Sequence, residues 1–160
     1  PRERRMSFSQ GPEYLGDVDQ PGVGAGATLV LPVNVDGALL SLGDAHGAQG
    51  DGEITGVAIE IEAVVELTVR VNDRHETGFV SLPQLNTAET IGSIAGFHGV
   101  NLGDCARAAF TDLARRLTAK HRFTTLEAYQ LLGQVGRIQV GNMIDPFYSV
   151  VASIDREFIE

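Results

Sequence analysis

The sequence of 160 residues has few of the features that mark secreted, membrane-bound or disulfide-stabilised proteins. Its one cysteine, Cys105, cannot form an internal disulfide, so we expect a protein of the reducing cytoplasm. No uninterrupted apolar run approaches the ~20 residues of a membrane span, so we expect no membrane segment. Residues 1–13 are charged and polar, without the apolar stretch of a secretion signal.

Positive charge is also scarce. The chain has 12 Lys and Arg against 21 Asp and Glu, which gives a formal net charge of −9 at pH 7. Outside residues 2–5, the longest basic run is the pair Arg115 and Arg116. This balance disfavours a phosphate backbone, so we expect no nucleic-acid partner. The hydrophobic fraction of 43% is typical of globular proteins, and we expect residues 1–160 to form one domain with a substantial core.

Strands are predicted after an irregular arm. Residues 1–26 are rich in glycine, proline and charge and have no regular period, whereas residues 27–33 and 38–42 have strand composition around an Asp-Gly turn. Odd positions of residues 57–71 are all apolar and several even positions are charged, which predicts a strand whose glutamates face solvent. At ~3.3 Å per residue this ribbon would span roughly 50 Å, so we expect it to bend or to divide into two strands.

Two helices are predicted in the C-terminal half. Apolar residues with helical spacing follow Asp104, which we expect to cap a helix ending near residues 120–121. Thr124 and Glu127 have the spacing of a capping box, which predicts that a second helix begins there.

A final β pair is predicted for residues 137–140 and 147–154, joined by a turn near Asp145. No internal repeat and no second domain boundary is visible. The sequence therefore predicts a β-rich α+β fold, with a sandwich- or barrel-like sheet, two helices in the C-terminal half and the final β pair.

The segment from Gly43 to Glu53, which reads Gly-Asp-Ala-His-Gly-Ala-Gln-Gly-Asp-Gly-Glu, has a composition that a fold alone does not require. If it is extended, Asp44 and His46 point to the same face and can share one cation. Two ligands are too few for tight zinc binding. We expect a third ligand from Glu53, Gln49, Asp19 or a segment outside this chain. The alternative is an ordinary solvated turn.

Residues 25–33 and 37–53 closely resemble the acetamidase/formamidase family, and weaker similarity continues through residues 56–71, 125–132 and 140–146. The resemblance covers the family's C-terminal portion. It implies a β-rich fold with helices that hydrolyses small amides such as formamide or acetamide to ammonia and a carboxylate, with a bound divalent metal, for which zinc is our expectation. Known members are longer, so we expect either a processed piece of a two-part enzyme or a truncated relative.

For this reaction we expect metal ligands, catalytic groups and substrate-binding groups from the same part of the chain. We assign Asp44 and His46 to the metal, Glu53 and Asp51 to catalysis, and Gln49 and His98 to the substrate. Glu53 is the expected proton shuttle, whereas Asp51 and Gln49 are expected to orient the substrate or support the ligands. His98 is either a proton donor or an ordinary histidine in a glycine-rich loop.

Cys105 is not expected to act as a nucleophile, because Lys120, the one lysine, lies at the far end of the same predicted helix. His75 is expected at a solvated hairpin tip. The expected partners are a small amide substrate and either an N-terminal partner chain or further copies of this chain. The competing function is a non-catalytic binding or assembly module that retains the β framework.

Overall fold

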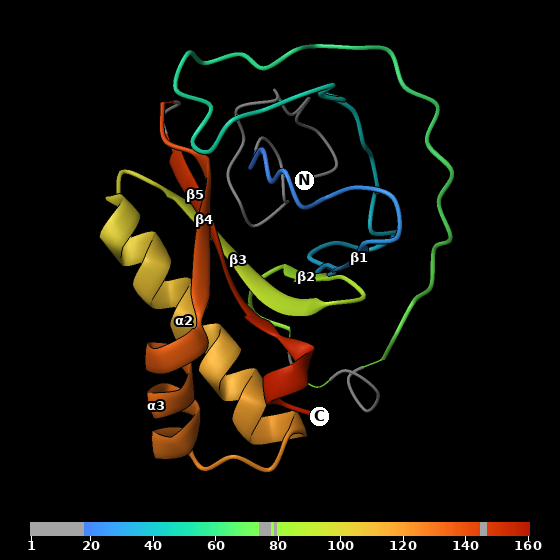
Figure 1. Cartoon of the computed structure of the whole chain (residues 1–160). Coiled ribbons are helices and arrows are strands. Elements are labelled where there is room, and N and C mark those ends of the chain that lie inside the picture. The colour runs from blue at the N-terminus through green and yellow to red at the C-terminus, as the bar shows by residue number, and fades with distance from the viewer. Residues whose placement is uncertain (1–17, 74–77, 79, 145–146) are drawn as a thin grey trace.

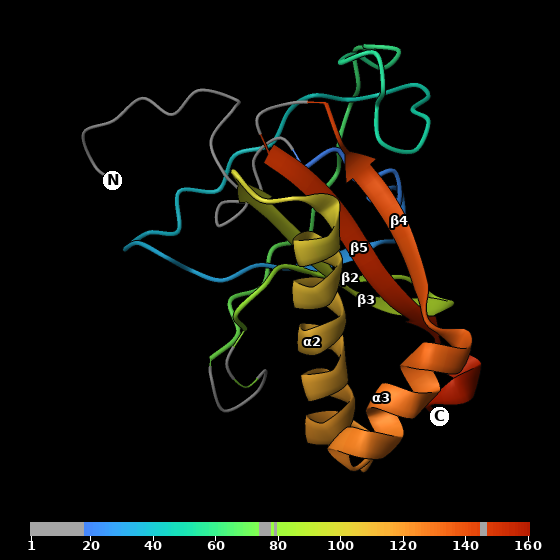
Figure 2. The same ribbon diagram turned by 90° about the vertical axis from the view of Figure 1, so that its left-hand side faces the viewer.

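The computed structural model describes residues 18–73, 78, 80–144 and 147–160. Within them, five antiparallel strands form one sheet in the order β1-β2-β3-β5-β4, and two helices lie on one of its faces (Figures 1 and 2). The elements are β1 (Thr28–Val30), β2 (Gln84–Asn86), β3 (Thr90–His98), α2 (Leu102–Lys120), α3 (Thr125–Val135), β4 (Arg137–Asn142), β5 (Phe147–Asp155) and the 3₁₀ helix η2 (Arg156–Phe158). The α+β class, the two helices and the final β pair are confirmed. The turn predicted near Asp145 lies outside the described residues.

Local capping signals explain where the helices begin. The Oδ1 atom of Asn101 accepts the backbone N–H of Asp104 at 3.0 Å, so the residue that caps α2 lies three positions before the predicted cap, Asp104. Asp104 instead lies in the first turn, where a carboxylate is favourable beside the helix dipole. In α3 the predicted capping box is confirmed, since the Thr124 N–H donates to Glu127 Oε2 at 2.8 Å and the Glu127 N–H donates to Thr124 Oγ1.

The main core lies between the helices and the sheet. Its fully buried side chains come from every second residue of β3 and β5 and from one face of α2. They include Ile91, Ala95, Val150, Ala152 and Ile154 from the strands and Cys105, Ala109, Leu113 and Leu117 from the helix. Burial of each large aliphatic side chain contributes about 1.5–3 kcal/mol to folding. This layer therefore stabilises the packing of the helices on the sheet.

Strand β3 does not follow from the sequence pattern. The glycine-rich loop expected around His98 is wrong, because Thr90–His98 pairs with β5 along its whole length, from Thr90 opposite Asp155 to His98 opposite Phe147. Gly92 and Gly96 make the strand hard to recognise in the sequence, because they lack side chains at two of its even positions. The odd positions Ile91, Ala95 and Phe97 nevertheless contact the main core, as expected for a strand.

Residues 57–71, here called the arch, do not form the predicted strand. They run outside the sheet as the green curve of Figure 1 and make one isolated bridge, between His46 and Glu60. Seven apolar side chains at odd positions of the arch are between 49% and 84% exposed, and Val64 is fully exposed. Their alternation is real, but among the described residues no strand lies beside the arch to complete a ladder. Residues 38–42 are likewise exposed and outside the sheet.

The part of the chain that the structure describes therefore forms one sheet and not the second layer of a sandwich or barrel. Of the strand predicted at residues 27–33, Thr28–Val30 forms β1 at one edge of this sheet. Neither described helix is long and apolar enough to cross a membrane.

Candidate metal centre

Residues 43–53, here called the loop, pair with the arch. Three backbone hydrogen bonds of 2.7 to 3.0 Å join residues 45–48 to residues 59–61 in an antiparallel arrangement. His46 and Glu60 are therefore directly opposite each other, and His46 Nε2 lies 3.3 Å from Glu60 Oε2. Antiparallel partners in a bridge project to the same side, which places both side chains on one surface.

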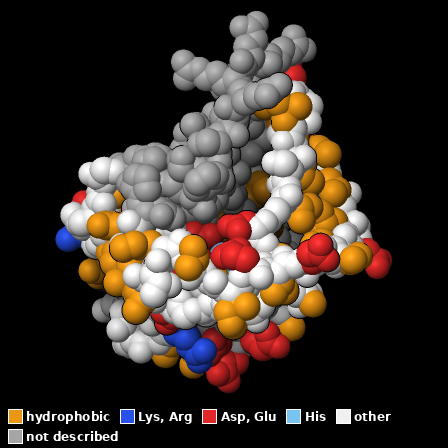
Figure 3. All heavy atoms as spheres, turned by 90° about the horizontal axis from the view of Figure 1, so that it is seen from above, with side chains coloured by type: hydrophobic (Ala, Val, Ile, Leu, Met, Phe, Trp, Pro, Cys, Tyr) orange, Lys and Arg blue, Asp and Glu red, His pale blue; other side chains and the backbone are white. Residues whose placement is uncertain are grey.

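Four carboxylates surround this imidazole. His46 Nε2 is 3.4 Å from Asp44 Oδ1 and 4.0 Å from Glu53 Oε1. Candidate ligand atoms of Asp19, Asp44 and His46 all lie within 4.8 Å of one another, as do those of His46, Glu53 and Glu60. Acidic side chains gather near the centre of the face seen in Figure 3, with apolar side chains exposed beside them.

Gln49 fixes the orientation of the imidazole. Its Nε2 donates to the carbonyl oxygens of Asp19 at 2.8 Å and Gly141 at 3.0 Å, so its Oε1 must face His46. His46 Nδ1 lies 2.9 Å from that oxygen and therefore donates its proton to it. The Nε2 lone pair is then directed toward the carboxylates. This is the tautomer that a metal-binding histidine needs.

Asp19 is anchored to the sheet. Asn142 is completely buried, and its Nδ2 donates to Asp19 Oδ2 at 2.7 Å while its own N–H donates to Ser149 Oγ at 2.9 Å. The pairing of β4 with β5 shifts register between Val140 and Asn142. Such bulges redirect backbone groups, and here the shift frees the Gly141 carbonyl to accept from Gln49.

Backbone strain is concentrated at the same place. Asp19, Asp44 and Glu53 have φ angles of 43°, 62° and 45°, in the left-handed region that non-glycine residues rarely adopt. Each such residue costs of order 1–3 kcal/mol unless its surroundings hold it. Three strained acidic residues around one histidine indicate that the arrangement serves function.

The charges of the cluster alter the acidity of the imidazole. Burial lowers the pKa of His46, but the hydrogen bond with Gln49 and the carboxylates of Glu60, Asp44 and Glu53 outweigh burial and raise it above 6.5. Only Glu53 among these carboxylates is buried, with 6% of its side chain exposed. Asp44 and Glu60 are 57% and 52% exposed and face solvent.

Most of the predicted site residues are brought together. Asp44, His46, Glu53 and Asp19 share the cluster, and Gln49 supports His46 from behind rather than facing the open side.

Two predicted residues lie differently. Asp51 is exposed and its Oδ1 accepts from Gln139 at 2.9 Å, outside the clusters of ligand atoms found in the described residues. His98 ends β3, and its side chain is outside the described part, as is His75.

Glu60 and Asn142 are functional candidates that the sequence pattern does not reveal. The alternation of the arch assigns Glu60 to a solvent face, and the signal that it belongs to the site is the pairing of its segment with the loop around His46. Asn142 carries no local signal in the sequence. Its role arises from the contact of β4 with residues 18–20. Asn142 and its partner Asp19 are 123 positions apart in the sequence.

The donor set fits a divalent cation. One imidazole whose Nε2 faces several carboxylate oxygens matches the ligands of catalytic zinc sites, and additional carboxylates also suit harder cations such as Mn²⁺. Four carboxylates within one cluster repel each other, and a bound cation would balance that charge.

Comparisons with known proteins identify the family of the chain. Residues 9–146 match the model of the acetamidase/formamidase family. A Schizosaccharomyces pombe protein named as a candidate formamidase is 41% identical over 61 residues, which are 38% of this chain and 15% of that protein.

Two solved structures share the fold. The acetamidase from Yersinia enterocolitica matches with a TM-score of 0.79 and 36% identity, over 91% of this chain and 42% of that one. The acetamidase from Bacillus halodurans matches with a TM-score of 0.78 and 27% identity, over 99% of this chain and 52% of that one. The chain thus spans about half the length of these solved relatives or less. The resemblance of the sequence is confirmed: the chain belongs to the acetamidase/formamidase family.

Proposed function

We propose that this chain contributes to metal-assisted hydrolysis of a small aliphatic amide, of the formamide or acetamide type, to ammonia and a carboxylate. The observation that carries the proposal is the gathering of four carboxylates around His46, three of them within 4.0 Å of its Nε2, together with the hydrogen bond between His46 Nδ1 and Gln49. Family membership and the activities for which the relatives are named support the choice of amides as substrates.

His46 is the proposed nitrogen ligand, and Asp44, Glu60 and Asp19 are the proposed oxygen ligands. A divalent cation held there, with zinc as our first choice, supplies Lewis-acid polarisation of the amide carbonyl and increases the acidity of a water molecule. The exposed sides of Asp44 and Glu60 leave the cluster accessible to substrate.

Glu53 is the proposed proton shuttle. Its carboxylate is buried, lies 4.0 Å from His46 Nε2 and is held on a strained backbone. In that position it takes a proton from the attacking water and delivers it to the nitrogen of the leaving ammonia. Asp51 is proposed to support the ligands from outside the cluster, since it accepts a hydrogen bond from Gln139 in β4.

A further polypeptide is proposed to complete the enzyme, either an N-terminal partner chain or another copy of this chain. The arch exposes a row of apolar side chains. Single exposed apolar residues are common on protein surfaces, whereas a contiguous row indicates a surface that another polypeptide covers. The solved relatives are about twice as long as the region that this chain covers. The unpaired Cys105 is consistent with a cytoplasmic enzyme.

The direct test is to measure metal content and ammonia release from formamide and acetamide in one purified sample. We expect about one divalent cation per site and amidase activity, with both lost in His46→Ala and the circular dichroism spectrum retained. Metal without hydrolysis of any short amide would instead support the non-catalytic binding module. Full metal content in His46→Ala would refute the proposed ligand set.

A further inference from the structure

A second polar pocket lies away from the candidate metal centre. It has a volume of about 220 Å³ and lies on the helix-covered face of the sheet. Its walls come from the C-terminal end of α2, from strands β1, β2 and β3, and from Arg156. Three cations, Arg116, Lys120 and Arg156, line it together with amide and apolar side chains and His121. Among the described residues, no carboxylate lines it.

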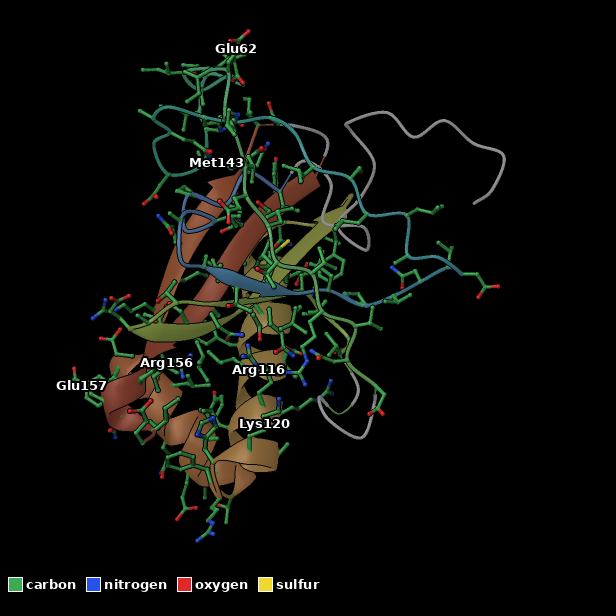
Figure 4. The ribbon with its side chains drawn as sticks, turned by 90° about the vertical axis from the view of Figure 1, so that its right-hand side faces the viewer. Glu62, Arg116, Lys120, Met143, Arg156 and Glu157 are labelled. Atoms are coloured by element: carbon green, nitrogen blue, oxygen red, sulfur yellow. The ribbon has the colours of Figure 1, made fainter. Side chains whose placement is uncertain are left out.

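This concentration of positive charge is unusual for the chain. The protein has 12 basic residues and a net charge of −9, yet three of those basic residues, including its one lysine, meet at one pocket. In Figure 4 their labels lie together around the end of α2, well below Met143, which packs against Gly52 beside the metal centre. The pocket is therefore spatially separate from the candidate active site.

Arg116 is held rigidly in the wall of the pocket. One of its terminal nitrogens donates to the Gly92 carbonyl and to Ser93 Oγ, and the other donates to Asn86 Oδ1 at 2.8 Å. Its Nε is buried without a hydrogen-bond partner among the described residues. The donors of this guanidinium thus outnumber the acceptors that the described chain supplies.

Like charges oppose one another in this wall. Burial and the neighbouring charge of Arg156 together lower the pKa of Arg116 to about 10, against the opposing effect of Asp112. Asp112 is itself bonded to the hydroxyls of Ser81 and Ser93, so its charge is shared with other donors. An anion between the two guanidinium groups would relieve their repulsion.

The other two cations are weakly engaged. Arg156 Nε donates to the Thr87 carbonyl at 3.1 Å, but its terminal NH1 is 3.9 Å from Glu160, an exposed residue. Lys120 forms no ion pair and no side-chain hydrogen bond within the described ranges of the chain. Both cations therefore retain donors for a ligand.

We propose that this pocket binds a small oxyanion, of the class of inorganic phosphate or a short carboxylate. Its volume is below the ~300–1,000 Å³ of sites for drug-sized ligands, so it suits a compact ion with a few waters. Arg116 supplies a fixed planar donor group, and Lys120 and Arg156 supply mobile charge that can close on the ion.

The test is calorimetric titration of the purified protein with inorganic phosphate and, separately, with acetate, at constant ionic strength maintained with chloride. We expect saturable binding of one anion per chain with a dissociation constant of about 1 mM or tighter. Titrations are repeated in the His46→Ala background, which removes any anion held at the candidate metal centre. Saturation by phosphate, by acetate or by both identifies which oxyanion the pocket accepts.

Three variants test the location. Lys120→Gln and Arg156→Gln should each weaken binding at least about fivefold, because each removes a charged donor. Arg115→Gln is the matched control, since Arg115 is an exposed arginine of the same helix outside the pocket, and it should bind as the parent does. Absence of saturable binding by both anions, or equal losses in Arg115→Gln and Lys120→Gln, would overturn the proposal.

Discussion

The carboxylate of Glu53 differs from those of Asp44 and Glu60 in being buried, and for this reason we propose it as the proton shuttle and not as a ligand. Glu53→Gln keeps the side-chain volume but cannot take up a proton. Because general acid–base catalysis is typically worth ~10²–10⁴-fold, we expect turnover of a short amide to fall at least a hundredfold with metal content unchanged.

Glu62→Gln is the control for Glu53, because Glu62 is an exposed glutamate of the arch that belongs to neither group of candidate ligand atoms; Figure 4 shows it at the outer end of the molecule. It should leave turnover unchanged. A loss of less than threefold in Glu53→Gln would remove the catalytic role, and a loss of metal in that variant would make Glu53 a ligand.

Gln49 gives a second test at the same scale. Gln49→Leu removes the acceptor for His46 Nδ1 and allows the imidazole to rotate or to change tautomer. Loss of such a supporting hydrogen bond typically reduces metal affinity 10–100-fold, so we expect a loss in this range by competition with a chelator. Unchanged affinity would show that the surrounding backbone alone positions His46.

The positions of individual site residues are predictable from the sequence where the signal is local. Asp44, His46 and Glu53 lie within one short glycine-rich segment, and their types and spacing indicate a shared site, although the sequence leaves an ordinary turn as the alternative. Glu60 cannot be found in this way, because its place depends on the pairing of the arch with the loop. The same holds for Asn142, whose partner Asp19 is remote in sequence.

At the scale of elements, the contact of β4 with residues 18–20 supports the site. A Cβ on Gly141 would collide with Gln20 Nε2, the Val18 carbonyl and Ser149 Oγ. Gly141→Ala should therefore destabilise the fold by about 1–3 kcal/mol and displace Asp19, with weaker metal binding. Chemical denaturation and metal titration measure the two effects.

Gly133→Ala is the matched control for Gly141→Ala. Gly133 lies within α3, and a Cβ there meets open space. Replacing a glycine inside a helix by alanine is favourable, so we expect this variant to raise the free energy of unfolding by about 0.5–1 kcal/mol. Equal destabilisation by both substitutions would contradict the close-contact explanation.

The capping box of α3 predicts a pH dependence. Hydrogen bonds from the Thr124 backbone and side chain lower the pKa of Glu127 below 4.5 in the folded state. The contribution of Glu127 to stability is thus present above its ordinary pKa and is lost as the pH falls through the lowered pKa. The stability difference between the parent and Glu127→Gln should be present at about pH 6 and shrink toward about pH 3.

The helices are predictable because the residues that cap them and form their apolar faces lie close together in the sequence. The sheet is less so, since a strand needs a partner that sequence alternation does not identify. Residues 57–71 have the clearest alternation in the chain and form no strand, whereas β3 contains two glycines and forms nine pairs with β5.

At the scale of the whole molecule, the arch predicts assembly with another polypeptide. Mass spectrometry under denaturing and native conditions should show either a second chain or a homo-oligomer. Val65→Asp and Val69→Asp place charge on the apolar row and should weaken the assembly, whereas Thr68→Asp, at an even position, should weaken it less. A fully active monomer of this chain alone would contradict the prediction.

The proposed ligands come from two parts of the chain, which Gln49 joins through its hydrogen bonds to the carbonyl oxygens of Asp19 and Gly141. Asp19 is bonded to Asn142 of β4, and Asp44, His46 and Glu60 lie on the loop and the arch. A cation bound by both parts would stabilise their contact, and the free energy of this stabilisation would depend on the concentration of free metal. Each tenfold rise in free metal above the dissociation constant would add about 1.4 kcal/mol to the stability of the closed arrangement. The supply of metal in the cell would then help to set how firmly the arch is held against the sheet.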